Sequence, residues 1–110
     1  MDSRFNYFIS KSSTLIYKLC IGKGSAKERL IESELEIRSV LRSPVPNKLI
    51  PLKDQIKQKL LYAGNSVDNK QGSVARSLYG KRNSTASKII AEIIALHREV
   101  EAHIKYSEVN

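Results

Sequence analysis

Residues 85–104 read TASKIIAEIIALHREVEAHI, and the apolar residues of this stretch repeat with the period of an α-helix. They recur at steps of three and four, which places them on one face of a helix. This stripe consists of Ile89, Ile93, Leu96, Val100 and Ile104, with Ile90, Ile94 and His97 at its flanks. Asn83, Ser84 or Thr85 can cap the free N–H groups at its start. The pattern predicts a long amphipathic C-terminal helix whose apolar face lies at the centre of the core.

A second helix is predicted upstream, from Ser25 to about Arg42. Ser25 and Glu28 form an S-x-x-E capping box, in which each of the two side chains accepts a backbone N–H. Apolar residues then follow at helical spacing as far as Pro44 and Pro46. Proline lacks an N–H and disfavours the α conformation in the residue before it, so the helix should end there.

The segment Gly22-Lys23-Gly24-Ser25 precedes this helix and is too short for the phosphate-binding loop G-x-x-x-x-G-K-[ST]. We instead expect Gly22 to end one helix and Gly24 to turn the chain into the Ser25 cap. Lys23 and Lys27 lie at the start of the second helix, where they support a weaker hypothesis of anion binding.

A third helix is predicted to begin near Pro51, because proline suits the first turn of a helix. We expect it to include Ile56, Leu60 and Leu61 and to end near Gly64.

Residues 64–73, GNSVDNKQGS, are rich in turn-forming residues and predict a loop. A short helical turn from Val74 to Tyr79 should follow. We expect it to end at Gly80, because glycine adopts a positive φ without steric cost.

The N-terminal segment fits two patterns. Its apolar residues alternate as in a strand at Leu15, Tyr17, Leu19 and Ile21, and they also fit a short helix that ends at Gly22. A strand here would have no pairing partner other than residues 4–9, so we predict a helix.

Together these patterns predict one all-α domain spanning residues 1–110, built from about four helices and a short helical turn, with frayed ends at 1–10 and 106–110. The apolar fraction of 41% is near the globular norm, and 5 glycines and 3 prolines are too few for a disordered or fibrous chain. The chain should therefore fold alone or as a small oligomer.

The net charge of +8 is concentrated in the middle of the chain. Residues 42–82 hold nine basic residues against two acids, Asp54 and Asp68, which is a net charge of +7. The basic residues are Arg42, Lys48, Lys53, Lys57, Lys59, Lys70, Arg76, Lys81 and Arg82. A local positive field attracts polyanions, so this block predicts an acidic partner.

The most specific local motif covers Ala75 to Ile89. It consists of the small residue Ala75, a glycine at Gly80 and a helix that begins with Ser and Thr residues. This pattern resembles a helix-turn-helix, whose second helix offers its N-terminal residues to base edges. Tyr79 is one residue too many before the glycine, and Lys81 stands where an apolar residue is usual. An ordinary helical hairpin, with Tyr79 packed against it, is the favoured alternative.

If nucleic acid binds, the predicted contacts gather around this bend. The cations would contact phosphates, and the hydroxyl and amide groups would form hydrogen bonds to the same phosphates. Tyr79 offers a ring on which a base can stack. The predicted site residues are Arg76, Lys81, Arg82, Asn83, Ser84 and Lys88, with Lys53, Lys57 and Lys59 as a secondary basic surface.

Tyr7-Phe8, then Cys20-Ile21-Gly22, then Arg29 partly resemble the paired motifs and following arginine of the GIY-YIG nucleases. The resemblance implies a metal-dependent nuclease with a β-hairpin in this segment. The chain departs from the family where Cys20 replaces a tyrosine and where no histidine follows Arg29. We keep a degenerate nuclease of this kind as a remote alternative.

Other candidate sites are weak. Cys20 is the only cysteine, so no intramolecular disulfide or cysteine-based zinc cage can form, and we expect it to be buried. His97 and His103 are six residues apart, unlike the i, i+4 spacing of helical metal ligands. The acids Glu32, Glu34 and Glu36 are expected on the solvated surface.

The apolar segment Leu15–Ile21 is too short to cross a membrane and is interrupted by Lys18. We therefore expect no association with membranes. The single cysteine fits the reducing cytoplasm, where we expect the protein to be, and we predict no metal and no cofactor.

For function, the sequence favours a non-enzymatic module that binds DNA, RNA or another acidic macromolecule. The alternative is a subunit that binds another protein chain or a second copy of itself through the apolar residues of 30–41 or 89–104.

Overall fold

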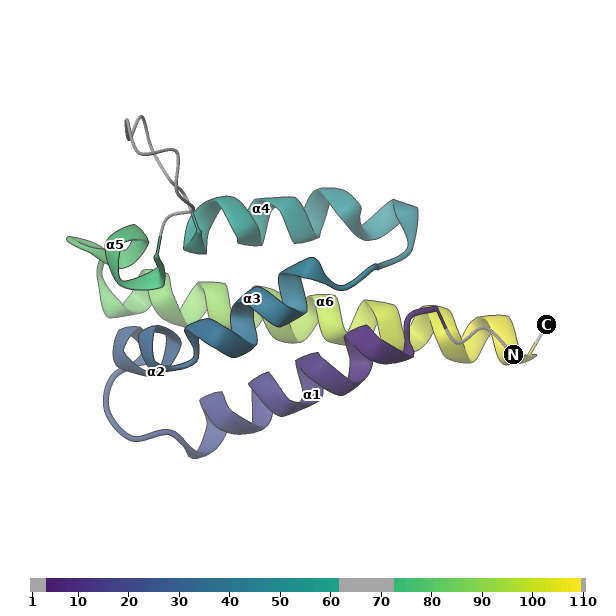
Figure 1. The fold of residues 1–110 in the computed structure, drawn as a ribbon, viewed down its shortest axis with the longest axis horizontal. Helices are drawn as coiled ribbons and strands as arrows, with labels where there is room; N and C mark the ends of the chain where they lie inside the picture. The colour runs from purple at the N-terminus through teal and green to yellow at the C-terminus, as the bar shows by residue number, and fades with distance from the viewer. Residues whose placement is uncertain (1–3, 62–72, 110) are drawn as a thin grey trace.

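The computed structural model describes residues 4–61 and 73–109, and every regular element in those residues is helical (Figure 1). The elements are α1 (Asn6–Ile21), α2 (Ala26–Glu32), α3 (Glu34–Arg42), the 3-10 helix η1 (Asn47–Leu49), α4 (Ile50–Leu60), α5 (Val74–Leu78) and α6 (Asn83–Val109). The predicted all-α class is confirmed. The number of helices is larger than predicted, because one expected helix is divided in two.

Helix α6 runs along the long axis of the molecule, whose extents are 46 × 33 × 19 Å (Figure 1). It contacts α1, α2, α4 and η1. The predicted stripe faces these helices, since Ile89, Ile93, Leu96 and Val100 are each at most 3% exposed. Fully buried partners come from every other α-helix and include Phe8, Leu15, Leu30, Ile37, Ile56, Leu60 and Leu78. The predicted central position of the C-terminal helix is confirmed.

The helix predicted from Ser25 to Arg42 is interrupted at Ser33, which separates α2 from α3. The Ser33 hydroxyl donates to the carbonyl of Arg29 at 2.8 Å, while its own N–H turns to the carbonyl of Leu30. A serine that bonds back to a helix carbonyl competes with the backbone ladder and bends the helix.

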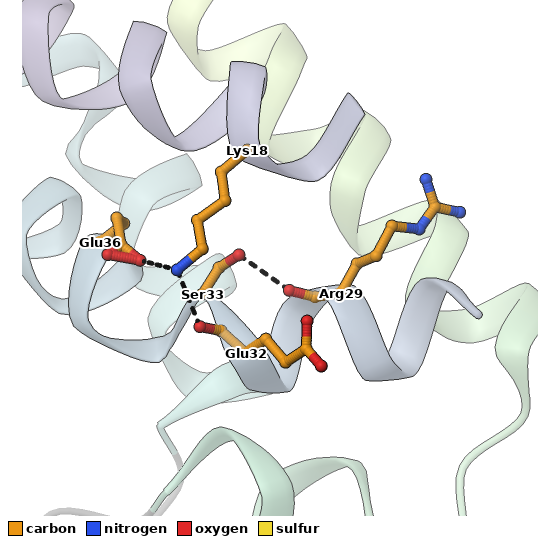
Figure 2. Close-up of polar contacts among 5 residues, drawn as sticks. All are labelled: Lys18, Arg29, Glu32, Ser33 and Glu36. Carbon is orange, nitrogen blue, oxygen red and sulfur yellow. Dashed lines mark hydrogen bonds and ion pairs between the residues drawn. The ribbon is translucent and has the colours of Figure 1, made fainter. Parts of the chain in front are cut away.

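Lys18 of α1 stabilises this break from outside (Figure 2). Its ammonium donates to the carbonyl of Glu32 at 3.0 Å and forms an ion pair with Glu36 at 2.6 Å. In an unbroken helix the Glu32 carbonyl would accept the N–H four residues later. Lys18 supplies a replacement donor, so the carbonyl at the end of α2 is satisfied without a continuous helix.

Helix α1 has 16 residues and is much longer than the short helix predicted. Asn6–Ser10 lie within it and residues 106–109 lie within α6, although we expected both ends to fray. Ser12 of α1 is fully buried and bonds to Nδ1 of His97 at 2.6 Å, which ties α1 to α6. Cys20, in contrast, is exposed, so its predicted burial is wrong because it faces away from the core.

Several predicted helix boundaries agree with the caps that the structure shows, but the cap predicted for the long C-terminal helix does not. Asn83 is already the first residue of α6, and its Oδ1 accepts the N–H of Lys27. Ser25 accepts the N–H of Glu28 at 3.2 Å, which confirms the Ser25 cap at the start of α2, while the Glu28 carboxylate accepts the Ser25 hydroxyl at 3.3 Å in place of its backbone N–H. Gly22 ends α1, and Gly24 has a φ of +90°. Pro51 lies in the first turn of α4, as predicted. The predicted stop at Gly64 and the predicted loop at 64–73 lie outside the described residues, except for Ser73.

Replacing Leu96 by alanine should lower the free energy of unfolding by about 2–5 kcal/mol, because it opens a cavity in the buried stripe of α6. The matched control is Leu35→Ala, since Leu35 is 76% exposed and its truncation should change stability by no more than about 0.5 kcal/mol. Urea unfolding followed by circular dichroism measures both. Equal effects of the two substitutions would contradict the central place of this stripe.

Candidate nucleic-acid interface

The bend between α5 and α6 is a type II turn over residues 78–81. Tyr79 has φ −58° and ψ 128°, Gly80 has φ +77°, and the N–H of Lys81 donates to the carbonyl of Leu78 at 2.9 Å. This turn type requires positive φ at its third residue, where glycine is favoured. The predicted role of Gly80 is confirmed, and Tyr79 is accommodated as the second residue of the turn.

A local cap and tertiary contacts stabilise α5, which has only five residues. Val74 and Leu78 are fully buried in the core. The Ser73 hydroxyl caps the helix by accepting the N–H of Arg76 at 3.0 Å. Glu34 of α3 accepts the N–H of Val74 at 2.7 Å. Glu34 was predicted only to lie on the solvated surface. Its carboxylate also joins α3 to the start of α5.

The bend also lies beside the start of α2, at the end of the molecule away from the start of α1 and the end of α6 (Figure 1). Oδ1 of Asn83, the first residue of α6, accepts the backbone N–H of Lys27 at 3.2 Å. Asn83 thus holds two helix N-termini together. The same contact brings the α2 start with Lys27, predicted separately as a weaker anion site, next to the predicted bend.

The cations predicted at the bend all face solvent. Arg76, Lys81, Arg82 and Lys88 are exposed, as is Ser84. Among the described residues no carboxylate forms an ion pair with any of these four cations. Their charges therefore remain available to an acidic partner.

Tyr79 projects into solvent with 88% of its surface exposed. The prediction that it packs against its own hairpin is wrong, because the turn directs Leu78 into the core and leaves the next residue outside. Helix α5 is also only five residues long and α6 has 27, so the bend joins a single helical turn to the core helix. This favours the hairpin over a helix-turn-helix, which needs two complete helices.

The secondary basic surface on α4 is partly used within the fold. Lys59 forms an ion pair with Glu92 of α6 at 2.7 Å. Lys53 donates to the carbonyl of Ser43 at 3.1 Å, beyond the end of α3. Lys57 is exposed. Two of the three lysines thus stabilise helix contacts, and this surface contributes less available charge than predicted.

A catalytic triad of serine, histidine and a carboxylate is suggested by the arrangement of Ser12, His97 and Glu101. The Ser12 hydroxyl is 2.6 Å from Nδ1 of His97, and Nε2 of His97 is 3.9 Å from Glu101. Ser12 is fully buried, however, and its hydroxyl also donates to the carbonyl of Ile9 at 3.2 Å. A substrate has no access to this oxygen, so the contact serves to join α1 and α6.

The segment that partly resembles the GIY-YIG nucleases is helical, because α1 occupies the residues where that family has a β-hairpin. Arg29 donates from Nη1 to the carbonyl of Leu19 at 3.0 Å and from Nε to the carbonyl of Ser25 at 3.4 Å. Its guanidinium points away from Lys18 and Glu36 in Figure 2. Arg29 therefore satisfies carbonyls at the end of α1 and just before α2.

Further site types find little support in the described residues. They contain no cluster of three or more His, Cys, Asp and Glu side chains suited to hold a metal ion. Within the same residues, no helix is sufficiently long and apolar to cross a bilayer. An open hollow of about 160 Å³ lined by Lys11, Leu35, Glu36 and Ser39 is smaller than typical small-molecule pockets.

The apolar residues of 30–41 and 89–104, which were predicted as a possible protein-binding surface, mostly lie in the core. Leu30, Ile37, Val40 and Leu41 in the range 30–41 are at most 6% exposed. In that range the exposed large apolar residues are Ile31 and Leu35, and the range 89–104 has none.

Comparison with known proteins gives no match, whether to family models, to curated proteins or to solved structures.

Replacing Glu34 by alanine should loosen α5, because the N–H of Val74 loses its acceptor. Amide hydrogen exchange across 74–78 should become about tenfold faster or more, as expected when a hydrogen bond to a charged group is removed. Glu36→Ala is the matched control, since it removes a carboxylate of the same helix that pairs with Lys18 instead. Unchanged exchange in Glu34→Ala would show that Glu34 does not hold α5.

Proposed function

We propose that this protein binds nucleic acid through the cations at the bend between α5 and α6. The observation that carries the proposal is the gathering of Arg76, Lys81, Arg82 and Lys88, all exposed and without carboxylate partners among the described residues, around one anchored turn. Phosphate contacts from arginine and lysine supply most of the affinity in sequence-independent binding.

The contrast with other cations supports this choice of surface. Lys18, Lys53 and Lys59 each bond to a carboxylate or carbonyl of another element. The fold thus employs those cations for its own stability and leaves the ones at the bend to solvent. A support that already positions charged side chains lowers the entropy lost on binding.

The nearby start of α2 extends this surface. The hydrogen bond from the N–H of Lys27 to Asn83 keeps the start of α2 beside the start of α6. Lys23 is exposed on the loop that precedes α2. We include Lys23 and Lys27 as secondary phosphate contacts. Their place on the same surface as the bend was not evident from the sequence, because the two segments are far apart in the chain.

The test is a titration of fluorescent duplex DNA, single-stranded DNA and RNA at several salt concentrations. Lys81→Ala/Arg82→Ala should weaken binding and reduce the slope of log K against log salt by about 2, because two phosphates are no longer neutralised by the protein. The matched control is Lys48→Ala/Lys105→Ala, which removes the same charge from exposed positions on η1 and the distal part of α6. Equal slopes in the two double variants would show that only net charge matters and would refute this surface.

A further inference from the structure

We infer that the bend is selective for single-stranded nucleic acid, with the ring of Tyr79 stacking on an unpaired base while Arg76, Lys81 and Arg82 contact the adjoining phosphates. This inference rests on the proposed function and adds the class of ligand. Proteins that bind single strands commonly combine a basic surface with exposed aromatic rings in this way.

The exposure of Tyr79 is the first observation behind the inference. At 88%, it is the most exposed of the large hydrophobic residues in the described part of the chain. An aromatic ring at such a position contributes nothing to the core and leaves its apolar faces in water. Stacking on a base would remove those faces from water beside the cations that hold the phosphates.

The turn holds the backbone of Tyr79 in place. The N–H of Tyr79 donates to the carbonyl of Arg76 at 3.3 Å, and the N–H of Lys81 donates to the carbonyl of Leu78 at 2.9 Å. Leu78, immediately before the tyrosine, is fully buried. The backbone of Tyr79 is therefore fixed on both sides, and only its two side-chain torsions are left to be ordered when a ligand binds.

The turn is open on the side of Gly80. A Cβ atom built there would meet no described atom within 4 Å outside Tyr79 and Lys81, the two neighbours of Gly80 in the chain. The ring of Tyr79 is accessible because 88% of the residue's surface is exposed. Lys81 and Arg82 follow directly in the chain, and Arg76 lies one helical turn before the tyrosine, so cations lie on both sides of it in the chain.

A duplex cannot use this ring in the same way. Its bases are stacked on one another, and exposing a base face within it requires two stacked base pairs to be separated. The cations at the bend contact the phosphates of either form. Stacking on Tyr79 therefore adds affinity only for a strand with unpaired bases.

The experiment compares oligothymidylate with an abasic strand of the same length, about 12 nucleotides, which lies within the usual size of single-strand sites. The two ligands carry the same phosphates and differ only in their bases. Wild-type protein should bind oligothymidylate at least about fivefold more tightly than the abasic strand, and Tyr79→Ala should abolish this difference. Tyr79→Phe should retain it, because phenylalanine keeps the ring. A long mixed-sequence duplex should bind wild-type protein and Tyr79→Ala equally.

Tyr106→Ala is the control for removal of an exposed tyrosine, since Tyr106 is 73% exposed near the opposite end of α6. It should bind both strands as wild-type protein does. Equal binding of oligothymidylate and the abasic strand by wild-type protein, or a difference that persists in Tyr79→Ala, would overturn the stacking role. If Lys81→Ala/Arg82→Ala still weakens binding in that case, the proposed function stands without the single-strand selectivity. Full binding by that double variant would overturn both.

Discussion

The burial of one apolar face of α6 is the constraint on which the other helices depend. Ile89, Ile93, Leu96 and Val100 are almost completely buried, and α6 contacts α1, α2, α4 and η1 along its length. Burying each of these side chains stabilises the fold by about 1.5–3 kcal/mol. Four of them together contribute about 6–12 kcal/mol, which is similar to the whole stability of a typical small domain. The positions of α1, α2 and α4 therefore follow from their contacts with α6, while α3 packs on α1 and α5 packs on α2 and α4.

The candidate interface lies where the chain enters α6, and the helix before it, α5, packs on α2 and α4. Five residues are too few for a stable isolated helix, so α5 requires its tertiary contacts. Leu78 supplies an apolar contact, Glu34 supplies an acceptor, and Asn83 joins the beginnings of α2 and α6. These interactions turn a short connection into a fixed support, from which cations and Tyr79 project into solvent.

Charged side chains in this protein serve two purposes. Lys18, Arg29 and Lys53 donate to backbone carbonyls at or near the ends of other helices, where carbonyls lack intrahelical partners. Such contacts allow several short helices to pack together in place of one long one. Arg76 and its neighbours at the bend have no such contact among the described residues. The number of basic residues in the sequence does not show which cations stabilise the fold and which remain in solvent, because this depends on which carbonyls lie within reach of each side chain.

The all-α class, the Ser25 cap, the positive φ of Gly80 and the buried stripe of α6 could all be predicted from the sequence, because each depends on residues within a few positions of one another. The exposed cations at the bend were predicted for the same reason. The break at Ser33 combines a local hydrogen bond, from the Ser33 hydroxyl to the carbonyl of Arg29, with a tertiary one from Lys18 of α1. Tertiary structure alone supplied Lys18, placed Lys27 beside Asn83 and left Tyr79 in solvent. Periodicity and capping are local properties, whereas a donor from another helix or the exposure of one ring is fixed only when distant segments pack together.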